Sequence, residues 1–422
     1  MSLMILADDL SGAADCAIGF AAAGCRTTVT LGAPQGVLAP DIEVIAADLD
    51  SRRLPPAQAA SVARDAWRVL HTPGRYLYKK IDSTLRGNWA AETAALAALA
   101  GVAIVSPAFP ATGRVMRGAQ VSVNGTPLEQ TDIWRLEHGR ASAHVGEMLS
   151  EAGLRTRALP VTVLRGDEAA ARAALAEAIE AGAQALVVDA ETAADLVQLA
   201  RASLGLDTPF FWVGSGGLAR ELPALGTLCA PRNTAHVLPP LPDGARVVMV
   251  GSLSPVSHRQ CERLLAAHPM QQIEVPPALL RAGADPAGQQ AQVAAIGAVL
   301  ARHESLLLRI GRDDDFDPAE GARLSSALAA LVAPHFHHVA ALVATGGETA
   351  RAMLSATGVD ALELLDEIEP GLPVSRAHGG HAPGVVTKAG AFGSDDALRL
   401  AYEHLLPSAS PSDGVPVKQS TL

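Results

Sequence analysis

The sequence predicts an α/β protein of two domains, each built as a mostly parallel sheet flanked by helices. Three observations lead to this prediction. Short apolar stretches alternate with Ala-rich helical stretches along most of the 422 residues, as in parallel sheets covered by helices. The chain is two to three times as long as an ordinary domain of about 150 residues. A proline-rich stretch without periodicity, 230–245, separates two runs of the alternation.

These observations divide the chain into an N-terminal domain, a linker, a C-terminal domain and a tail. The tail is rich in Ser and Pro, and such a composition cannot bury an apolar core, so we expect it to be disordered. The expected boundaries, in chain order, are 1–230, 231–245, 246–405 and 406–422.

The N-terminal half opens with a strand–loop–helix–strand unit. A buried apolar strand is expected over 3–7, and an Ala-rich helix that ends near Gly24 follows a polar loop. The same rhythm then continues. It predicts strands at 26–32, 42–48, 76–81 and 102–108, with helices at 55–70 and from Asn88 onward.

Residues 111–135 depart from this rhythm. Alternating residues surround the pair Asn124-Gly125, which is a strong signal for a β-hairpin, so we expect an excursion from the sheet. The α/β alternation resumes beyond it. In the C-terminal half it predicts strand–helix pairs at 246–268 and 338–357, strands at 272–276 and 305–311, helices at 285–303 and up to about 333, and closing strands at 371–377 and 384–392.

Composition excludes several classes of function. The formal net charge is −11 and no block of Lys or Arg occurs, so nucleic acid is not expected as a partner. The apolar start meets two aspartates after seven residues, which is too short for a signal peptide or a membrane span. We therefore expect a cytoplasmic protein without a membrane partner. No Cys-x-x-Cys spacing occurs, so buried free thiols are expected at Cys16, Cys25, Cys229 and Cys261.

Polar residues gather where predicted strands end and helices begin. Ligands of open α/β sheets bind beyond the carboxyl ends of the strands, so each such cluster is a candidate site. In the first cluster, Asp9 or Ser11 could simply cap the following helix, which needs only one residue. The adjacent carboxylates of Asp8 and Asp9 repel each other, so we expect at least one of them to contact a ligand or metal. Asp9 is the preferred base or substrate contact.

The loops after two further strands carry cations. Arg52 and Arg53 are either solvated loop charges or a guanidinium fork for a carboxylate. In the next cluster, 79–88, helix capping and a surface pair of lysines would explain only some of the polar groups. A cation, a carboxylate and hydroxyl groups together suit a small polyhydroxy acid. We expect this loop to bind one through Lys80, Asp82, Ser83 and Arg86.

The C-terminal half has glycines and hydroxyl groups at its strand ends. Glycines let backbone amides approach closely, and free amides at a helix N-terminus favour phosphate, although a tight turn would use the same glycines. Neither a P-loop nor a dinucleotide fingerprint occurs. His378 and His381 resemble ordinary loop histidines, so no metal site is expected. The sequence predicts a phosphate site from Ser252, Ser254, Thr345, Gly346, Gly347, Glu348, Thr349, Lys388, Gly390 and Gly393.

Taken in order, the clusters closely resemble the four-carbon acid sugar kinases. The likeness spans about residues 3 to 400 and rests on LADDLSGAADCA, DSRRLPP, YKKIDSTLRGN, PAFPATGR with VNGTPLEQT, GSLSP, ATGGETA, EPGLPVSR and KAGAFG. The form KKIDSTLRGN is more similar to the D-threonate and D-erythronate 4-kinase branch than to the 3-oxo-tetronate kinase branch.

The resemblance implies an N-terminal sugar-acid domain, a C-terminal ATP domain and an active site in the cleft between them. ATP, with Mg²⁺ on its phosphates, would phosphorylate the 4-hydroxyl of a tetronate, and either Asp9 or Asp82 would act on the hydroxyl proton. Substrate contacts implied by the motifs are Asp9, Arg52, Lys80, Ile81, Asp82 and Ser83. The implied nucleotide contacts are Ser252, Gly346, Gly347, Glu348, Thr349 and Gly390.

Alternative functions stay open at this stage. The chain could act on a 3-oxo-tetronate, bind a sugar acid without catalysis, or belong to another enzyme class such as a lyase or dehydrogenase. A binding protein would have no use for the glycine turns, and no nicotinamide fingerprint is present. The sequence leaves open the stereochemistry of the acid and the oligomeric state, with a homodimer among the options.

Overall fold

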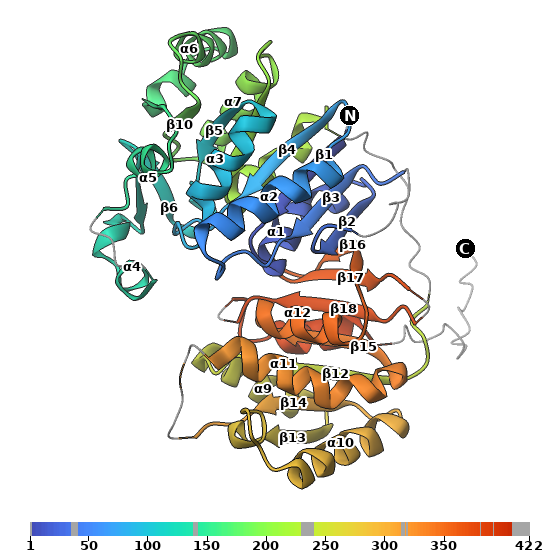
Figure 1. Ribbon diagram of the computed structural model, residues 1–422. Helices are drawn as coiled ribbons and strands as arrows, with labels where there is room; N and C mark the ends of the chain where they lie inside the picture. Colours follow the sequence, from blue (N-terminus) through green and yellow to red (C-terminus); the bar gives the residue numbers. More distant parts are fainter. Residues whose placement is uncertain are drawn as a thin grey trace, which may run out of the picture.

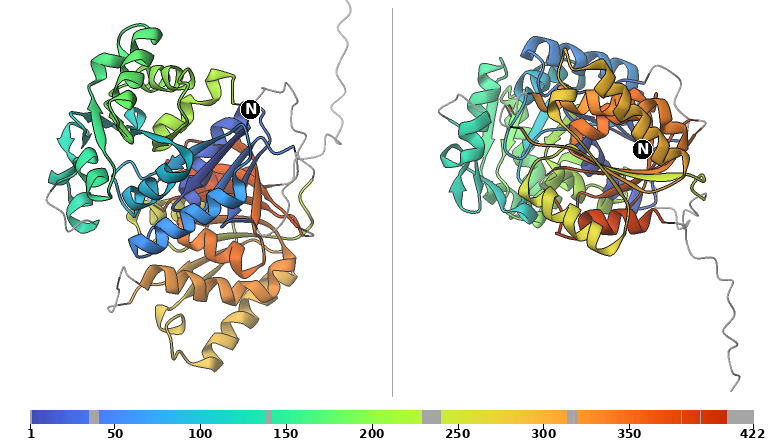
Figure 2. Two further views of the ribbon diagram at one scale, coloured as in Figure 1. Left: turned by 45° about the horizontal axis from the view of Figure 1, so that its top comes forward. Right: turned by 90° about the horizontal axis from the view of Figure 1, so that it is seen from below.

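The computed structural model describes residues 2–34, 41–137, 142–228, 240–313, 317, 320–379, 381–390 and 392–406. Within them the chain forms one mixed, mostly parallel sheet of 15 strands and a small antiparallel sheet of three. Helices cover both faces of the large sheet (Figures 1 and 2). The predicted α/β class is confirmed. Most of the expected linker and the expected tail beyond 406 lie outside the described residues.

The N-terminal half contributes eight parallel strands in the order β2-β3-β1-β4-β11-β5-β10-β9. Its helix α2 packs on α3, and α1 packs on α8. The bounds are β1 Ser2–Ala7, α1 Leu10–Ala22, β2 Thr27–Leu31, β3 Val44–Asp48, α2 Pro56–Leu70, β4 Arg75–Lys80, α3 Trp89–Ala100, β5 Val102–Ser106, α4 Asp132–Glu137, α5 Val145–Glu151, β9 Thr156–Leu159, α6 Glu168–Glu180, β10 Ala185–Val188, α7 Ala193–Leu204, β11 Phe210–Gly214 and α8 Gly216–Glu221.

The C-terminal half contributes five parallel strands, in the order β13-β14-β12-β15-β18, followed by the antiparallel strands β17 and β16. Helix α11 packs on α12, and α9 packs on α13. The bounds are β12 Ala245–Val250, α9 Pro255–Ala267, β13 Gln271–Val275, α10 Pro286–Ala301, β14 Leu306–Ile310, α11 Gly321–Val332, β15 Val339–Thr345, α12 Gly347–Ala356, β16 Ala361–Glu367, β17 Pro373–Ala377, β18 Gly384–Lys388 and α13 Ala397–His404.

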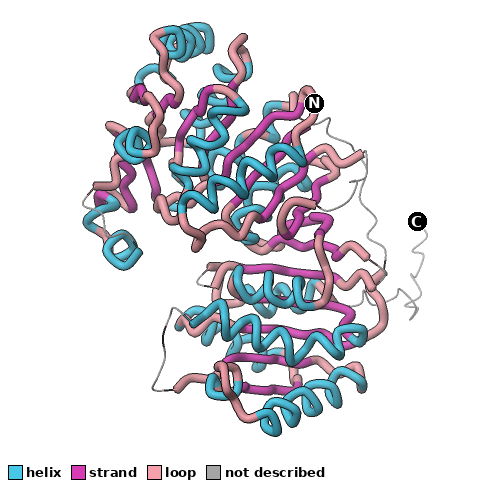
Figure 3. The backbone as a smooth tube through the Cα atoms, viewed as in Figure 1, coloured by secondary structure: helices cyan, strands magenta, loops and turns pink. Residues whose placement is uncertain are grey.

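The sheets of the two halves join edge to edge. Strand β16 pairs antiparallel with β2, so a single sheet runs through the molecule (Figure 3). The parallel strands of the two halves therefore have opposite directions at the join. Sheets twist by roughly 20–25° per strand pair, so over the six pairings from β15 to β1 the direction turns through roughly 120–150°. This twist lets the carboxyl ends of strands from both halves face one another.

The predicted hairpin is part of the small sheet. Strands β6 (Arg114–Arg117), β7 (Gln120–Val123) and β8 (Thr126–Pro127) pair antiparallel, and Asn124 and Gly125 form the turn between β7 and β8. The Asn124 amide donates to the carbonyl of Gly113 at 2.7 Å, and a methyl group on Gly113 would collide with the Asn124 side chain. The turn thus fixes the start of β6 against the loop that follows β5.

The cysteines depart in part from the prediction of free thiols. Cys16 and Cys261 are free and buried. Cys25 is disulfide-bonded, so the prediction is wrong for this residue. The pattern of spacings could not reveal this, because the bond depends on which segments the fold brings together. Cys229 lies outside the described residues. Among the described helices, none has both the length and the apolar composition needed to cross a bilayer.

Candidate active site

Two turns from opposite halves of the chain touch beyond the carboxyl ends of β1 and β15. A methyl group on Gly347 would lie 2.9 Å from the hydroxyl oxygen of Ser11. The hydroxyl groups of Ser11 and Thr345, on the two sides of this contact, are buried and lack a hydrogen-bond partner among the described residues. Buried hydroxyls are normally paired, so a polar ligand at this junction would account for both.

Four charged residues at or beyond the carboxyl ends of β1, β3 and β4 form a cluster: Asp8, Asp9, Arg52 and Lys80. Arg52 donates from Nε and Nη2 to the two oxygens of Asp8 at 2.7 and 3.0 Å, and its Nη1 lies 2.9 Å from Asp9 Oδ2. Lys80 Nζ lies 3.4 Å from Asp8 Oδ1 and 3.2 Å from Asp9 Oδ1. Because β3, β1 and β4 are neighbours in the sheet, their loops converge. The fold thus brings together Asp9, Arg52 and Lys80, which the sequence predicted from separate loops.

Burial and ion pairing have opposite effects on the pKa values of Asp8 and Lys80 in this cluster. Burial alone would raise the pKa of Asp8, but Lys80 and Arg52 hold it well below its usual value. Burial alone would lower the pKa of Lys80, but Asp9 and Asp8 raise it overall. Both groups are therefore charged at neutral pH, and each depends on the other for its stability in a buried position.

Asp9 also caps α1, because its Oδ1 accepts a hydrogen bond from the backbone amide of Gly12 at 2.9 Å. Capping and ligand contact do not exclude each other at Asp9, because the cap uses one hydrogen bond to Oδ1 and each carboxylate oxygen can accept more than one. Gly12 contributes in a way that the sequence did not indicate. A methyl group there would lie 2.1 Å from Lys80 Nζ, so only glycine leaves room for the ammonium group.

The loop after β4 is held by its own charges. Arg86 donates from Nε and Nη2 to the two oxygens of Asp82, each at 3.0 Å, and the amide and hydroxyl of Thr84 also donate to Asp82. Burial would raise the pKa of Asp82, but Arg86 and then Arg52 and Lys80 hold it far below its usual value. Ile81 and Ser83 are buried on either side of Asp82. Helix capping by Ser83 or Thr84, the alternative considered for this loop, does not occur, since α3 begins after Asn88.

A buried ion pair stabilises the loops after β3 and β4. Lys79 and Glu92 are fully buried and 2.8 Å apart, and Glu92 also accepts the hydroxyl hydrogen of Ser51. Asn88 Nδ2 donates to the carbonyls of Ser51, Arg52 and Leu54. The lysines of this motif are therefore not a surface pair, because both lie inside the protein. Together these contacts fix the backbone that carries Arg52.

On the facing side, serines and glycines meet beyond β12 and β18. The hydroxyls of Ser252 and Ser254 lie 3.1 Å apart, and Ser254 caps α9. Ser257 Oγ donates to the carbonyl of Gly390 at 2.8 Å, and a methyl group on Gly390 would lie 2.7 Å from Ser252 Oγ. Since β12, β15 and β18 are neighbours in the sheet, this cluster lies next to the turn between β15 and α12.

That turn holds five of the predicted residues. Gly346 has a φ of +94°, which favours glycine, and α12 begins at the next residue. Glu348 is partly exposed in the first turn of α12, while the hydroxyl of Thr349 is buried and lies 3.0 Å from that of Ser325. The turn therefore presents backbone amides and one carboxylate, at the end of β15 where Thr345 lies.

Two predicted phosphate ligands do not face this turn. Lys388 Nζ donates to the carbonyls of Ala389, Gly390 and Phe392 at 2.9 to 3.0 Å, and burial lowers its pKa to about 8. Gly393 sits in a turn with φ of +85°, where a methyl group would collide with Glu369. Both residues therefore shape the loop after β18.

Ion pairs connect the two halves around the junction. Arg53 Nη2 lies 2.6 Å from Glu348 Oε1, so Arg53 is not simply a solvated charge. Arg351 of α12 pairs with Asp48 and, at 3.0 Å, with Asp50 at the end of β3. Burial raises the pKa of Asp48 to about 6, an effect that Arg351 opposes. The structure is thus closed across the junction.

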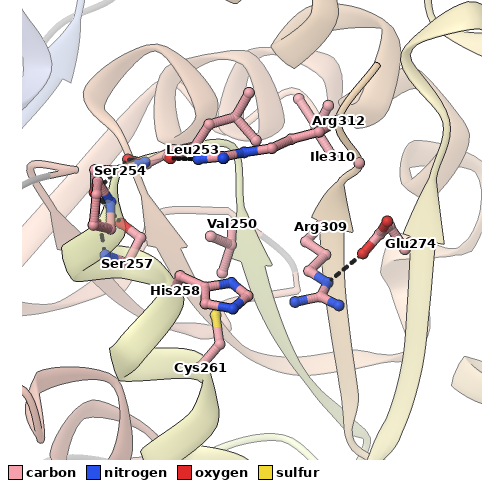
Figure 4. Close-up of a pocket in the computed structure, with 13 residues that line it drawn as sticks. Val250, Leu253, Ser254, Ser257, His258, Cys261, Glu274, Arg309, Ile310 and Arg312 are labelled. Carbon is pink, nitrogen blue, oxygen red and sulfur yellow. Dashed lines mark hydrogen bonds and ion pairs between the residues drawn. The ribbon is translucent and has the colours of Figure 1, made fainter. Parts of the chain in front are cut away.

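A pocket of about 440 Å³ opens beyond the carboxyl ends of β12, β14 and β13, next to the serine cluster (Figure 4). Ser252 and Ser254 line it. The remaining polar lining was not predicted from the sequence: Arg309 pairs with Glu274 at 2.8 Å, and Arg312 donates to the carbonyl of Leu253 at 2.6 Å. The one signal in the sequence that could have pointed to Arg309 was its position as a charged residue near the end of an otherwise apolar stretch.

The contact between the turns gives a direct prediction. Gly347→Ala should lower kcat for the phosphoryl transfer that the sequence resemblance implies by about 10- to 100-fold, because the methyl group displaces the Ser11 hydroxyl or α12 and so misplaces the two turns. Steady-state kinetics of the purified variant would measure this. Gly166→Ala is the matched control, since its methyl group meets only Ala170, at 3.9 Å. Equal kcat in both variants would mean that the turns do not act together.

Comparisons with known proteins agree with this two-sided arrangement. Residues 3–222 match the family model described as a sugar-binding N-terminal domain, and residues 247–398 match a nucleotide-binding C-terminal domain. A D-threonate kinase from Cupriavidus necator is 52% identical, over 98% of this chain and 100% of the relative. A D-threonate kinase from Bordetella bronchiseptica is 35% identical, over 94% and 96%.

Two further relatives extend the comparison. A 3-oxo-tetronate kinase from Methylobacterium radiotolerans is 34% identical, over 96% of this chain and 99% of the relative. A solved structure from Salmonella typhimurium LT2, described as a putative tRNA synthase, superposes with a TM-score of 0.82 at 21% identity. It covers 96% of this chain and 100% of its own, and at this identity it supports the fold alone.

Proposed function

Since the chain belongs to the four-carbon acid sugar kinase family, we propose that it transfers the γ-phosphoryl group of ATP to the 4-hydroxyl of D-threonate or a closely related four-carbon acid. The observation that carries the proposal is the contact between Ser11 and Gly347. It places a cluster of carboxylates and cations from one half against a glycine turn from the other. Such a junction can hold a hydroxylated acid and a triphosphate side by side.

Asp9 suits the role of base better than Asp82. Asp82 accepts four hydrogen bonds from Arg86 and Thr84, and its low pKa makes it a weak proton acceptor. The Asp9 side chain is less buried than that of Asp82. It also lies two residues from Ser11, which is at the junction. In the proposed step the substrate oxygen bonds to the γ-phosphorus, the bond to ADP breaks, and Asp9 accepts the hydroxyl proton.

The nucleotide would lie along the ends of β15, β18 and β12. Its phosphates would meet the backbone amides at Gly346 and Gly347, at the N-terminus of α12. The nucleoside would occupy the neighbouring pocket, where Figure 4 shows His258 and Arg309 reaching into the same space. Pockets for a nucleoside commonly combine apolar walls with a few polar groups, as this one does.

Magnesium fits this arrangement without a protein cage. Among the described residues no three His, Cys, Asp or Glu side chains gather as a metal site. In kinases Mg²⁺ keeps several waters and is held by phosphate oxygens with one or two carboxylates. Glu348, beside the glycine turn, has the required chemistry. Bound Mg²⁺ would neutralise charge on the phosphates during transfer.

A coupled ADP-release assay tests the proposed function. D- and L-threonate, D- and L-erythronate and the 3-oxo acids are compared, and NMR locates the phosphate on the product. We expect D-threonate to give the highest kcat/KM and a 4-phosphate. A higher kcat/KM for a 3-oxo acid would assign the chain to the other branch. ADP release that no four-carbon acid stimulates would contradict the proposal.

Arg309→Ala tests the nucleoside pocket. The expected result is a rise of about tenfold in KM for ATP with KM for D-threonate unchanged, because Arg309 lines only the nucleotide side. Arg302→Ala is the control, since Arg302 lies after α10 and pairs with the nearby Glu304. An unchanged KM for ATP in the Arg309 variant would place the nucleoside elsewhere.

A further inference from the structure

The charged residues of the proposed acid site already neutralise one another. Asp8, Asp9 and Asp82 carry three negative charges, and Arg52, Lys80 and Arg86 pair with them. A four-carbon acid brings a further carboxylate. Burying it next to this cluster would be costly unless another cation faces it. The described structure should therefore hold a cation near Asp82 whose hydrogen-bonding capacity is unused.

Arg114, the first residue of β6, meets these conditions. Its Nη1 donates to Thr112 Oγ1 at 3.2 Å, but its Nε is buried and has no hydrogen-bond partner among the described residues. Burial lowers the pKa of Arg114, while Asp82 raises it and Arg86 lowers it, so both loop charges lie within electrostatic range. A guanidinium remains charged in proteins, and its fork matches a carboxylate.

The backbone holds Arg114 firmly in this place. The amide of Phe109 donates to the Arg114 carbonyl at 2.7 Å, and the Arg114 amide donates back at 3.2 Å. The hairpin turn packs against Gly113 just before it. The hairpin therefore fixes the backbone of Arg114, whose charge lies within electrostatic range of Asp82 and Arg86.

The order of the strands indicates how the acid substrate is oriented in the site. Along the sheet, β15 precedes β1, β1 precedes β4, and β5 lies farther on. Gly347 and Asp9 therefore lie on the nucleotide side of the site, and Arg114, after β5, lies on the far side. An acid whose 4-hydroxyl faces the phosphates would direct its carboxylate toward Arg114.

We propose that Arg114 binds the carboxylate of the acid substrate. This inference rests on the proposed kinase function and adds the residue that fixes the orientation of the acid. Arg52, Lys80 and Arg86 then serve to hold the carboxylates of the protein and the substrate hydroxyls.

The test compares an acid with its uncharged amide. In Arg114→Gln, KM and the calorimetric Kd for D-threonate should rise by about 10- to 100-fold, the usual cost of a charge-assisted contact, with KM for ATP unchanged. D-threonamide, which lacks the charge, should change by less than about threefold. Arg114→Lys should fall between wild type and Arg114→Gln, because it keeps the charge and loses the fork.

Arg117→Gln is the matched control. Arg117 lies on the same strand but is exposed and pairs with Glu191, so KM for D-threonate should not change. An unchanged KM in Arg114→Gln, or equal losses for acid and amide, would overturn the proposal. If both Arg114 variants lose the cooperative thermal transition, Arg114 is a structural residue and the proposal is also wrong.

The same experiment separates this inference from the proposed function. A wild-type protein that binds D-threonate but transfers no phosphate would contradict the kinase activity, and calorimetry of the variants would still decide the role of Arg114. A wild-type protein that binds no four-carbon acid would contradict both. Where D-threonamide binds too weakly to measure, the proposal is decided by whether Arg114→Gln raises KM for D-threonate while KM for ATP stays unchanged.

Discussion

Asp9→Asn is expected to lower kcat for D-threonate phosphorylation by about 10²- to 10⁴-fold, the range for loss of a general base. Asparagine keeps the shape of the side chain and caps a helix as well as aspartate does, so α1 should remain intact. The variant removes the proposed proton acceptor and one negative partner of Lys80 and Arg52. Coupled ADP release at saturating ATP and D-threonate measures the effect.

The control for this variant is Asp285→Asn. Asp285 caps α10 in the same manner, through the amides of Ala287 and Gly288, at the opposite end of the C-terminal half from the junction. Its kcat should equal that of wild type, and both variants should keep the wild-type circular dichroism spectrum. An Asp9→Asn enzyme that is folded and retains full kcat would remove Asp9 from the catalytic machinery and reopen the case for Asp82.

Lys80→Met should reduce both activity and stability. Lys80 is buried between Asp8 and Asp9, and its removal leaves these carboxylates with Arg52 as their remaining ion-pair partner. Breaking a buried pair from one side typically costs about 3–5 kcal/mol, so the free energy of unfolding should fall by about this amount. We expect kcat/KM for D-threonate to fall by more than about 100-fold, because the carboxylates lose their positions.

Urea unfolding and steady-state kinetics on the same preparation measure the two effects. Arg302→Met is the control, because it removes a cation from an exposed pair with Glu304 and should leave both quantities close to wild type. If Lys80→Met were as stable as wild type, the ion pairs of Lys80 would contribute little. If it kept full kcat/KM, Lys80 would lie outside the acid site.

Sequence reasoning found the part of this site in which a polar residue or a glycine follows an apolar stretch. Asp9, Lys80 and Gly346 stand at or just beyond the carboxyl ends of strands, where ligands of parallel sheets bind. Such positions can be found from one sequence, because apolar periodicity locates the strand and the polar residue marks its end. Asp9 also shows that a carboxylate can cap a helix and pair with cations of other loops at the same time.

The parts that were not found depend on long-range pairing. Strand β16 joins the two halves through β2, but its stretch contains Glu363, Asp366 and Glu367, and no apolar alternation marks it. Lys79 and Glu92 meet inside the protein although thirteen positions separate them in the sequence. Such contacts follow from the packing of whole elements, and no local pattern encodes them.

The pocket residues illustrate an intermediate case. Arg309 and Glu274 lie near the ends of β14 and β13, so their place in the sheet could have been predicted. Their pairing could not, because it requires the order of the strands. The same reasoning applies to Arg351, whose partners Asp48 and Asp50 lie in the other half of the chain.

A crystal structure with D-threonate and a non-hydrolysable ATP analogue tests the central claim most directly. The account predicts that the 4-hydroxyl faces the γ-phosphate where Ser11 and Gly347 meet, with Asp9 beside the hydroxyl and Arg114 at the acid's carboxylate. A complex in which the acid and the nucleotide occupy surfaces that do not share this junction would contradict it.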